Sequence, residues 1–502
     1  MKKIIELYKI KSEDLTVDVN ITSQAGLTKR YELIIPEIKE ATRALLDEIK
    51  HELITEVKIS TAEILDIKII ESLKKRFSVK AKEIIKNKLP DINEITLKLL
   101  IGILLNEMLG LENLEFLLND ENLEEIVIVS SKEPIRVYHK KYGWLETNLS
   151  VQNEDQIQNY GNIIARRVGR QVTTLNPLLD AHLITGDRAN VVLYPVATKG
   201  NTLTIRKFAR DPWTVVDFIQ NNTCNSNIFA LLWLAIQYEM NVLISGGTAS
   251  GKTSFLNVLM PFIPTNHRVL SIEDTRELQL PEFLYWTPLI TRQPNPEGLG
   301  EVSMLDLLVN SLRMRPDRII LGEIRRAREA EVLFEAMHTG HSVYSTVHAD
   351  SMNETIQRLI NPPINVSPNL LSAVNLNVVM FRDRKKGIRR VYQVGEFLSA
   401  EEEGKVVPKP NILYRWNPGK DAIVEHASSL RFFDELSRHT GMSMQEINKE
   451  IKDKKMILDY LVKNKLRTIE YVGKFMKEYY INPDLIQDII KKNKKPNESL
   501  EL

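Results

Sequence analysis

The segment GGTASGKT, residues 246–253, has the residue types and spacing that most directly indicate chemistry. It satisfies G-x-x-x-x-G-K-[ST], follows the apolar run NVLIS and opens the helical run TSFLNVLM, which is the context that a phosphate-binding loop requires. Glycines let such a loop wrap closely around phosphate oxygens, with backbone N–H groups and the positive end of a helix dipole facing them. The segment therefore predicts a nucleoside triphosphate site.

Within this loop, Lys252 is expected to reach the β- and γ-phosphates and Thr253 to bind magnesium. The alternative, a glycine turn with an incidental lysine, is disfavoured because a strand-like run precedes the loop and a helix-like run follows it. The residues predicted to contact the nucleotide are Gly247, Thr248, Ala249, Ser250, Gly251, Lys252, Thr253 and Ser254.

Three further apolar runs end in acidic or imidazole side chains. Taken singly, an acid after a strand is commonly a cap or a salt-bridge partner, and an isolated histidine is more often structural than catalytic. The carboxyl ends of parallel strands meet at one sheet edge, however, so these groups together favour a single site. HRVLSIED supplies Glu273 and Asp274, with Glu277 a turn on; RIILGE supplies Glu323; and SVYSTVHA supplies His348, with His341 just before it.

The run RIILGE departs from the usual pattern of phosphate-loop enzymes, in which this strand ends on an aspartate near the metal. Gly322 has no side chain to offer, so the acids of SIEDTRE are predicted to supply the carboxylates near magnesium through bound water. Glu323, one position further on, is predicted to polarise the attacking water as general base. His348 is expected to hydrogen-bond either the γ-phosphate or Glu323.

Composition sets the class of protein. The 502 residues suggest about three domains, and the apolar fraction of 43% and charged fraction of 26% are ordinary for a soluble globular chain. A net charge of +1 gives no sign of a nucleic-acid or membrane-surface binder. Cys224 is the one cysteine, which excludes an internal disulfide and a cysteine metal cluster and fits a reducing cytosol. MKKIIELYKIKSED is predicted not to be a signal peptide, and residues 97–111 are predicted to form a buried helix.

Hydrophobic periodicity divides the chain. Residues 1–35 contain two candidate strands, LTVDVNIT and KRYELII, and a helical pattern follows. Residues 112–208 look α+β, and ARDPWT at 209–214 is a candidate hinge. Beyond 225, apolar strands without polar alternation indicate a parallel sheet buried on both faces. The predicted parts are a mostly helical domain (1–110), an α+β domain (111–208), a linker (209–222), an ATPase domain (223–420) and C-terminal helices (421–502).

The four strand-end motifs, in this order, resemble those of the type II/type IV secretion ATPase superfamily, the motors of pilus and archaellum assembly, type II secretion and conjugation. GGTASGKT is similar to its Walker A loop, RVLSIEDTRELQLP to its aspartate box, RPDRIILGEIR to its Walker B and TGHSVYSTVHAD to its histidine box. The resemblance covers about residues 112–400. GGTASGKT, TIRKF, YHKKYGWLET and the helical C-terminal region resemble the archaeal pilus and archaellum branch, and one cysteine excludes the four-cysteine zinc insertion typical of bacterial type II enzymes.

The resemblance implies an α/β fold: a RecA-like P-loop motor domain with an α+β N-terminal domain, a mostly helical N-terminal extension and a helical C-terminal segment. It implies a homohexamer that hydrolyses ATP with magnesium at the cytoplasmic face of a membrane, where it acts on a polytopic platform protein. Arginines of the second domain typically face the triphosphate in this family, and the matching positions are Arg170, Arg188 and Arg206. Such an arginine, delivered by domain closure, would neutralise transition-state charge.

Two other functions compete with this one. A nucleic-acid-translocating motor with a RecA-like core is disfavoured by the near-neutral charge and by the lack of a basic stripe with interleaved aromatics, so no nucleic acid is expected. A nucleotide-gated scaffold that does not hydrolyse ATP is disfavoured because both Lys252 and Glu323 are present.

Overall fold

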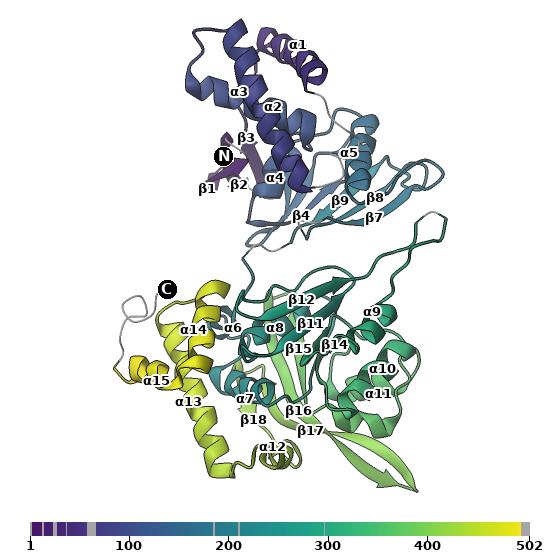
Figure 1. The fold of residues 1–502 in the computed structure, drawn as a ribbon, viewed down its shortest axis with the longest axis vertical. Helices are drawn as coiled ribbons and strands as arrows, with labels where there is room; N and C mark the ends of the chain where they lie inside the picture. Colours follow the sequence, from purple (N-terminus) through teal and green to yellow (C-terminus); the bar gives the residue numbers. More distant parts are fainter. Residues whose placement is uncertain are drawn as a thin grey trace. The chain divides into compact units, whose positions relative to one another are not determined.

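The computed structural model describes residues 3–12, 15–23, 28–36, 38–57, 67–183, 186–208, 211–295 and 297–492. The chain divides into two compact units, Met1–Arg210 and Asp211–Leu502, each drawn in Figure 1. The predicted hinge at 209–214 spans this boundary, and its residues 209 and 210 lie outside the described residues. The finer division into five parts stays a prediction.

The first unit is built on a nine-stranded sheet with the order β1-β2-β3-β6-β5-β4-β9-β8-β7. A single hydrophobic core runs from Ile10 to Ile205, so residues before and after position 110 share both the sheet and the core. The strands are β1 (Lys3–Ser12), β2 (Leu15–Ser23), β3 (Arg30–Ile34), β4 (Leu123–Ile128), β5 (Arg136–His139), β6 (Gly143–Thr147), β7 (Leu178–His182), β8 (Arg188–Val192) and β9 (Thr202–Arg206); the helices are α1 (Glu40–Glu56), α2 (Ile67–Lys88), α3 (Glu94–Leu109), α4 (Leu114–Asn119) and α5 (Glu154–Arg167).

Local signals explain the helices of this unit. Helix α5 begins where the Asn153 side chain accepts the Gln156 N–H, and it ends just before Gly169, whose φ of 67° is the left-handed conformation that closes many helices. Helix α3 is the apolar run predicted as a buried helix, and its residues from Leu100 to Asn106 are all buried. In the described part of the chain, none of the helices is both long and apolar enough to cross a bilayer.

The second unit contains a nine-stranded sheet with the order β12-β11-β13-β14-β10-β15-β16-β17-β18. The strands from β12 to β15 pair in parallel, which confirms the predicted buried parallel sheet, and an antiparallel extension follows. The strands are β10 (Val242–Gly246), β11 (Arg268–Glu273), β12 (Tyr285–Ile290), β13 (Arg318–Leu321), β14 (Ser342–Val347), β15 (Leu376–Asp383), β16 (Ile388–Glu402), β17 (Lys405–Asn417) and β18 (Ala422–Glu425).

Helices cover both faces of this sheet, as Figure 1 shows. One hydrophobic core joins the sheet to α6 (Val215–Gln220), α7 (Ser226–Gln237) and α8 (Lys252–Leu259) and to the C-terminal helices. A second core joins the other face to α9 (Met304–Ser311), α10 (Ala327–His338) and α11 (Met352–Ile360). Continuous apolar strands such as RIIL, buried at all four positions, follow from burial on both faces.

The C-terminal region is helical, as predicted, and belongs to the core of the second unit. Its helices are α12 (Phe432–Thr440), α13 (Met444–Lys463), α14 (Ile469–Ile481) and α15 (Pro483–Lys491). Lys454 is fully buried, donates to Glu450 (2.7 Å) and to the Tyr479 hydroxyl (2.9 Å), and lies 5.0 Å from the ring centre of Trp233 on α7. This buried cation is satisfied by an anion, a hydroxyl and a ring face, and it fixes α13 and α14 against α7.

Candidate functional site

The loop between β10 and α8 takes a shape that only glycine permits at two positions. Gly246 has φ +154°, and a Cβ there would lie 2.5 Å from the Ser250 hydroxyl and 2.7 Å from the Met380 carbonyl oxygen. Gly251, at the start of α8, has φ +97°. The chain therefore turns tightly into the helix, as a phosphate cradle requires.

Lys252 points back into its own loop. Its Nζ donates to the carbonyl oxygens of Gly246 (2.9 Å) and Gly247 (3.0 Å). Burial lowers the pKa of Lys252, while the nearby carboxylates of Glu323, Asp350 and Glu277 act in the opposite direction. The lysine thus belongs to the same electrostatic site as acids that lie far away in the sequence.

Strand register brings the predicted strand ends to one edge of the sheet. Ser245 of β10 is level with Val347 of β14, and Leu321 of β13 is level with Ser345 of β14 and Ile272 of β11. Because all four strands are parallel, Glu273, Glu323 and His348 follow their strands at the same edge as the phosphate loop.

Glu323 follows β13 on a backbone that is anchored on both sides. The Gly322 N–H donates to the Ile272 carbonyl (2.9 Å) and the Ile324 N–H to the Thr346 carbonyl (2.9 Å). The Thr346 hydroxyl also donates to the Gly322 carbonyl (2.7 Å). These bonds hold the backbone of Glu323 between β11 and β14, so the sheet sets the point from which its side chain extends.

Arg325 is the residue of this site that sequence reasoning missed. Its Nε donates to Glu323 Oε2 (2.9 Å), its Nη2 lies 2.8 Å from the same oxygen, and its Nη1 pairs with Asp274. One guanidinium therefore joins acids that follow two adjacent strands. The contact could have been predicted from the sequence, because Arg325 lies two residues beyond Glu323 and side chains at i and i+2 of an extended segment share a face.

Glu273 is the most buried acid of the site, with 3% of its surface exposed. Its Oε1 accepts the N–H groups of Glu277 (2.9 Å) and Leu278 (3.1 Å), while its Oε2 is buried and has no hydrogen-bond partner among the described residues. Burial raises the pKa of Glu273 to about 7, with those N–H groups acting in the opposite direction. Glu273 therefore shapes the loop after β11 and keeps one carboxylate oxygen available.

The two predicted histidines lie at opposite ends of β14. His348, after the strand, has its Nε2 3.0 Å from the Thr248 hydroxyl of the phosphate loop. His341, before the strand, lies beside Thr339, with its Nδ1 3.4 Å from that hydroxyl. The six residues of β14 lie between them and separate the two by roughly 20 Å. The structure therefore does not bring His341 to the phosphate loop within one chain.

The three predicted arginines gather at one place in the first unit. Arg188 is level with Arg206 across β8 and β9, and it donates to Asp180 from Nε (2.9 Å) and Nη2 (2.6 Å). Arg170 donates to the Asp180 carbonyl (3.1 Å). The hydrogen bond from Arg188 lowers the pKa of Asp180. The approach of these arginines to a nucleotide stays a prediction.

The sequence of this chain is similar to those of known proteins. Residues 149–385 match the family model described as Type II/IV secretion system protein. An uncharacterised protein of Methanocaldococcus jannaschii is 40% identical over 64% of this chain, which spans 58% of the length of that relative. The type IV secretion system protein PtlH of Bordetella pertussis is 30% identical over 50% of this chain and 84% of its own. The X-ray structure of the Legionella pneumophila ATPase DotB is 19% identical, covering 75% of this chain and 94% of its own, with a TM-score of 0.39.

Proposed function

Because the chain belongs to the type II/IV secretion ATPase superfamily, we propose that its phosphate loop and the adjacent strand ends form one site that hydrolyses ATP with magnesium. The observation that carries the proposal is the strand register, which sets Glu273, Glu323 and His348 at the same sheet edge as Lys252. A phosphate cradle, a carboxylate near the metal and a carboxylate that can polarise water are groups that metal-assisted phosphoryl transfer to water uses.

In the proposed reaction, Lys252 leaves the carbonyl oxygens of its loop and binds the β- and γ-phosphates. Glu323 accepts a proton from water while the water oxygen bonds to the γ-phosphorus. The bond from that phosphorus to the bridging oxygen breaks, and ADP and phosphate leave. Glu323 is suited to this step because the sheet fixes its backbone and Arg325 holds its Oε2, which leaves its other carboxylate oxygen to act as base.

Magnesium fits this site through phosphate oxygens and water. In the described ranges, no three His, Cys, Asp or Glu side chains come together as a ligand set. Magnesium ordinarily keeps several waters and takes only one or two protein groups beside substrate phosphates. Thr253 is the proposed direct ligand, and the unpartnered Oε2 of Glu273 is suited to accept from a metal-bound water, with Asp274 and Glu277 nearby. The ion would neutralise charge on the phosphates.

His348 is proposed to report the state of the nucleotide to the sheet. Its contact with Thr248 already joins the end of β14 to the loop that would hold the phosphates. Loss of the γ-phosphate would change the surroundings of this pair and, through Gly322 and Thr346, those of Glu323.

The proposed working form is a homohexamer in which the arginines of the first unit, Arg170, Arg188 and Arg206, reach a triphosphate as the two units move relative to each other. In this form the pairing of Arg188 with Asp180 is exchanged for pairing with phosphate oxygens, which suit a guanidinium equally well. Hydrolysis would then be coupled to movement about residues 209–214.

The proposed process is assembly of a type IV pilus-like filament, pilus or archaellum, or related secretion, at the cytoplasmic face of a membrane. Support comes from the family, from the secretion name of the Bordetella relative and from the similarity to an archaeal protein. A motor of this kind requires a membrane-embedded partner to transmit force, and a polytopic platform protein is the proposed one.

Two measurements on the purified protein test this function. Release of phosphate from ATP should require magnesium. Light scattering should give the mass of six chains, as expected for a sixfold ring, when a nonhydrolysable ATP analogue and magnesium are present. No phosphate release under any of these conditions would overturn the enzymatic proposal, and persistent monomers at micromolar concentration with the analogue would overturn the ring.

A further inference from the structure

One arginine ties the beginning of the second unit to the C-terminal helices. Arg467 lies in the turn between α13 and α14, and its Nη2 pairs with Asp211 Oδ2 at 2.8 Å. Its Nε donates to Asp217 Oδ1 at 2.9 Å. The two carboxylates stand at the two ends of the segment 211–217, so a single guanidinium joins both ends of this segment to a turn that is distant in the sequence.

Thr214, in the middle of the segment, makes a further contact with the same turn. Its hydroxyl donates to the Arg467 carbonyl oxygen (2.6 Å), and its side chain is buried. The Thr214 N–H donates to Asp217 Oδ2 (2.9 Å) in the capping box that begins α6. The carboxylate of Asp217 therefore caps α6 with one oxygen and accepts from Arg467 with the other.

The turn between α13 and α14 has hydrogen bonds of its own. The Arg467 N–H donates to the Lys465 carbonyl oxygen (3.0 Å). The Thr468 hydroxyl accepts the Tyr471 N–H (3.3 Å), which caps the start of α14. Because local bonds already fix the backbone on both sides of its side chain, Arg467 offers the segment 211–217 an ordered support.

Apolar packing fixes α6 but not the residues before it. Val215 and Val216 are buried in the core that also contains residues of α13 and α14, and Figure 1 shows these helices in the same part of the second unit. Asp211, by contrast, has a side chain that is 43% exposed. The position of the stretch that leads into α6 therefore depends on its polar contacts with Arg467.

The arrangement of these contacts is specific for arginine. An isolated ion pair at a protein surface contributes little, but a network in which one guanidinium contacts two carboxylates contributes more. The Asp217 side chain is 14% exposed, so its pair with Arg467 is also shielded from water. The planar fork of arginine reaches both acids at once, which the single ammonium group of a lysine does less well.

We propose that Arg467 is a clasp that makes residues 211–217 a fixed part of the second unit, so that movement of the first unit pivots on the N-terminal side of Asp211. For the movement itself the inference rests on the proposed function, which it deepens by assigning residues 211–214 of the predicted hinge to the second unit. The turn between α13 and α14 then takes up the force that the linker transmits, which gives the C-terminal helices a part in the motor.

Hydrogen exchange of the full-length protein, followed by mass spectrometry, tests the clasp. In the wild type, residues 211–221 should exchange at the same rate with and without a nonhydrolysable ATP analogue and magnesium. In Arg467→Ala the same residues should exchange about tenfold faster, because local opening no longer breaks these contacts. Residues 242–259, which contain β10 and α8, should exchange as in the wild type and show that the fold is intact. Arg467→Lys should recover part of the protection.

Lys465→Ala is the matched control, because Lys465 is an exposed cation of the same turn. It should leave the exchange of residues 211–221 unchanged. Asp211→Asn is a second, milder variant, since it weakens one contact at a half-exposed side chain and leaves the core untouched. It should raise the exchange of this segment by a smaller factor than Arg467→Ala.

Exchange of residues 211–221 at the wild-type rate in Arg467→Ala would overturn the inference. If Arg467→Ala lost protection throughout the second unit, a wild-type rate in Asp211→Asn would overturn it instead. Exchange in the wild type that became faster in this segment on addition of the analogue would also overturn it, because the segment itself would then bend. All three results leave the proposed hydrolysis in place, whereas a protein that released no phosphate from ATP would overturn the proposed function without altering the exchange of Arg467→Ala.

Discussion

The guanidinium of Arg325 lies 2.8 Å from the carboxylate of Glu323 and also pairs with Asp274. The proposed catalytic base is therefore held by a cation two residues away, in addition to the backbone bonds that fix Gly322 and Ile324. Arg325 is a positioning residue in this account: it contacts the base and acts on the reaction through it.

Arg325→Ala is predicted to lower kcat for ATP hydrolysis by roughly tenfold or more while KM changes less than about threefold. The reason is that the hydrogen bonds and ion pairs of this side chain are with Glu323 and Asp274. Arg325→Lys should recover part of the rate, because it keeps the charge but lacks the fork that joins two carboxylates. Steady-state kinetics of the variants would measure both parameters.

The control for this series is Arg328→Ala. Arg328 lies in the same segment, is 76% exposed and pairs with Glu331 at 3.1 Å, away from the site acids. It should hydrolyse ATP at the wild-type rate. A rise in KM without a fall in kcat for Arg325→Ala would show that Arg325 binds substrate instead of orienting the base.

Lys252→Ala is predicted to abolish measurable binding of ATP and of tripolyphosphate. In the proposed reaction the ammonium group leaves the carbonyl oxygens of Gly246 and Gly247 and pairs with the β- and γ-phosphates, and the alanine variant lacks that pairing. Equilibrium binding of a fluorescent ATP analogue would detect the loss. The control is Lys409→Ala, on the exposed β16–β17 hairpin, which should bind the analogue as tightly as the wild type. Binding of the analogue by Lys252→Ala at the wild-type affinity would contradict the role of the loop as the phosphate site.

The burial of Lys454 leads us to predict that the stability of the protein depends on pH. Burial lowers the pKa of Lys454 from 10.5 to about 8, with Glu450 acting in the opposite direction. Between these values the unfolded chain keeps the proton and the folded chain releases it, so the free energy of unfolding rises with pH. Below pH 8 both states hold the proton and the contribution of this group is constant. From pH 8 to pH 10 the gain is about 2 kcal/mol.

Denaturant unfolding of wild type and Lys454→Met would measure this gain as a difference. The stability of the wild type relative to the variant should increase from pH 8 to pH 10. Lys455→Met is the control, because Lys455 neighbours Lys454 on α13 but is 40% exposed and pairs with Asp459 at the surface. If the difference in free energy of unfolding between wild type and Lys454→Met did not change with pH, the pKa of Lys454 would not be lowered in the folded protein.

Much of the second unit followed from the sequence, because its signals are local. The runs that became β10, β11, β13 and β14 lack the polar alternation of a strand with one face in water, and β11, β13 and β14 are followed within two residues by an acid or a histidine. Chain connectivity through helices then requires parallel pairing, which places Lys252, Glu273 and Glu323 at one edge.

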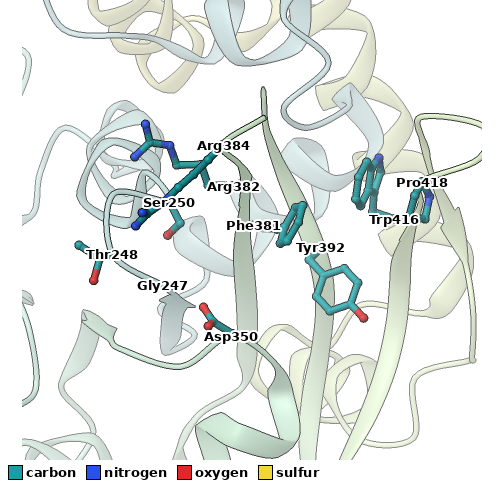
Figure 2. A pocket seen from close by; sticks show the side chains of 10 residues that line it. All are labelled: Gly247, Thr248, Ser250, Asp350, Phe381, Arg382, Arg384, Tyr392, Trp416 and Pro418. Carbon is teal, nitrogen blue, oxygen red and sulfur yellow. The ribbon is translucent and has the colours of Figure 1, made fainter. Parts of the chain in front are cut away.

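What the sequence did not reveal depends on contacts between distant or alternating positions. The rings of Phe381, Tyr392 and Trp416, drawn in Figure 2, lie side by side only because β15, β16 and β17 pair antiparallel. The register of this pairing has irregularities that the residue pattern does not predict. Strands β1, β7 and β12 also escaped prediction. Arg325 was visible in the sequence, but an arginine near an acid is usually a surface pair, and the convergence of Asp274 from another strand gives it its role.

The measurement that tests the central claim most directly compares wild type and Glu323→Gln for both ATP binding and single-turnover hydrolysis with magnesium. Glutamine keeps the shape of the side chain and cannot take a proton from water, so the variant should bind ATP as tightly as the wild type and hydrolyse it about a hundredfold or more slowly. Hydrolysis at the wild-type rate by Glu323→Gln would contradict the account.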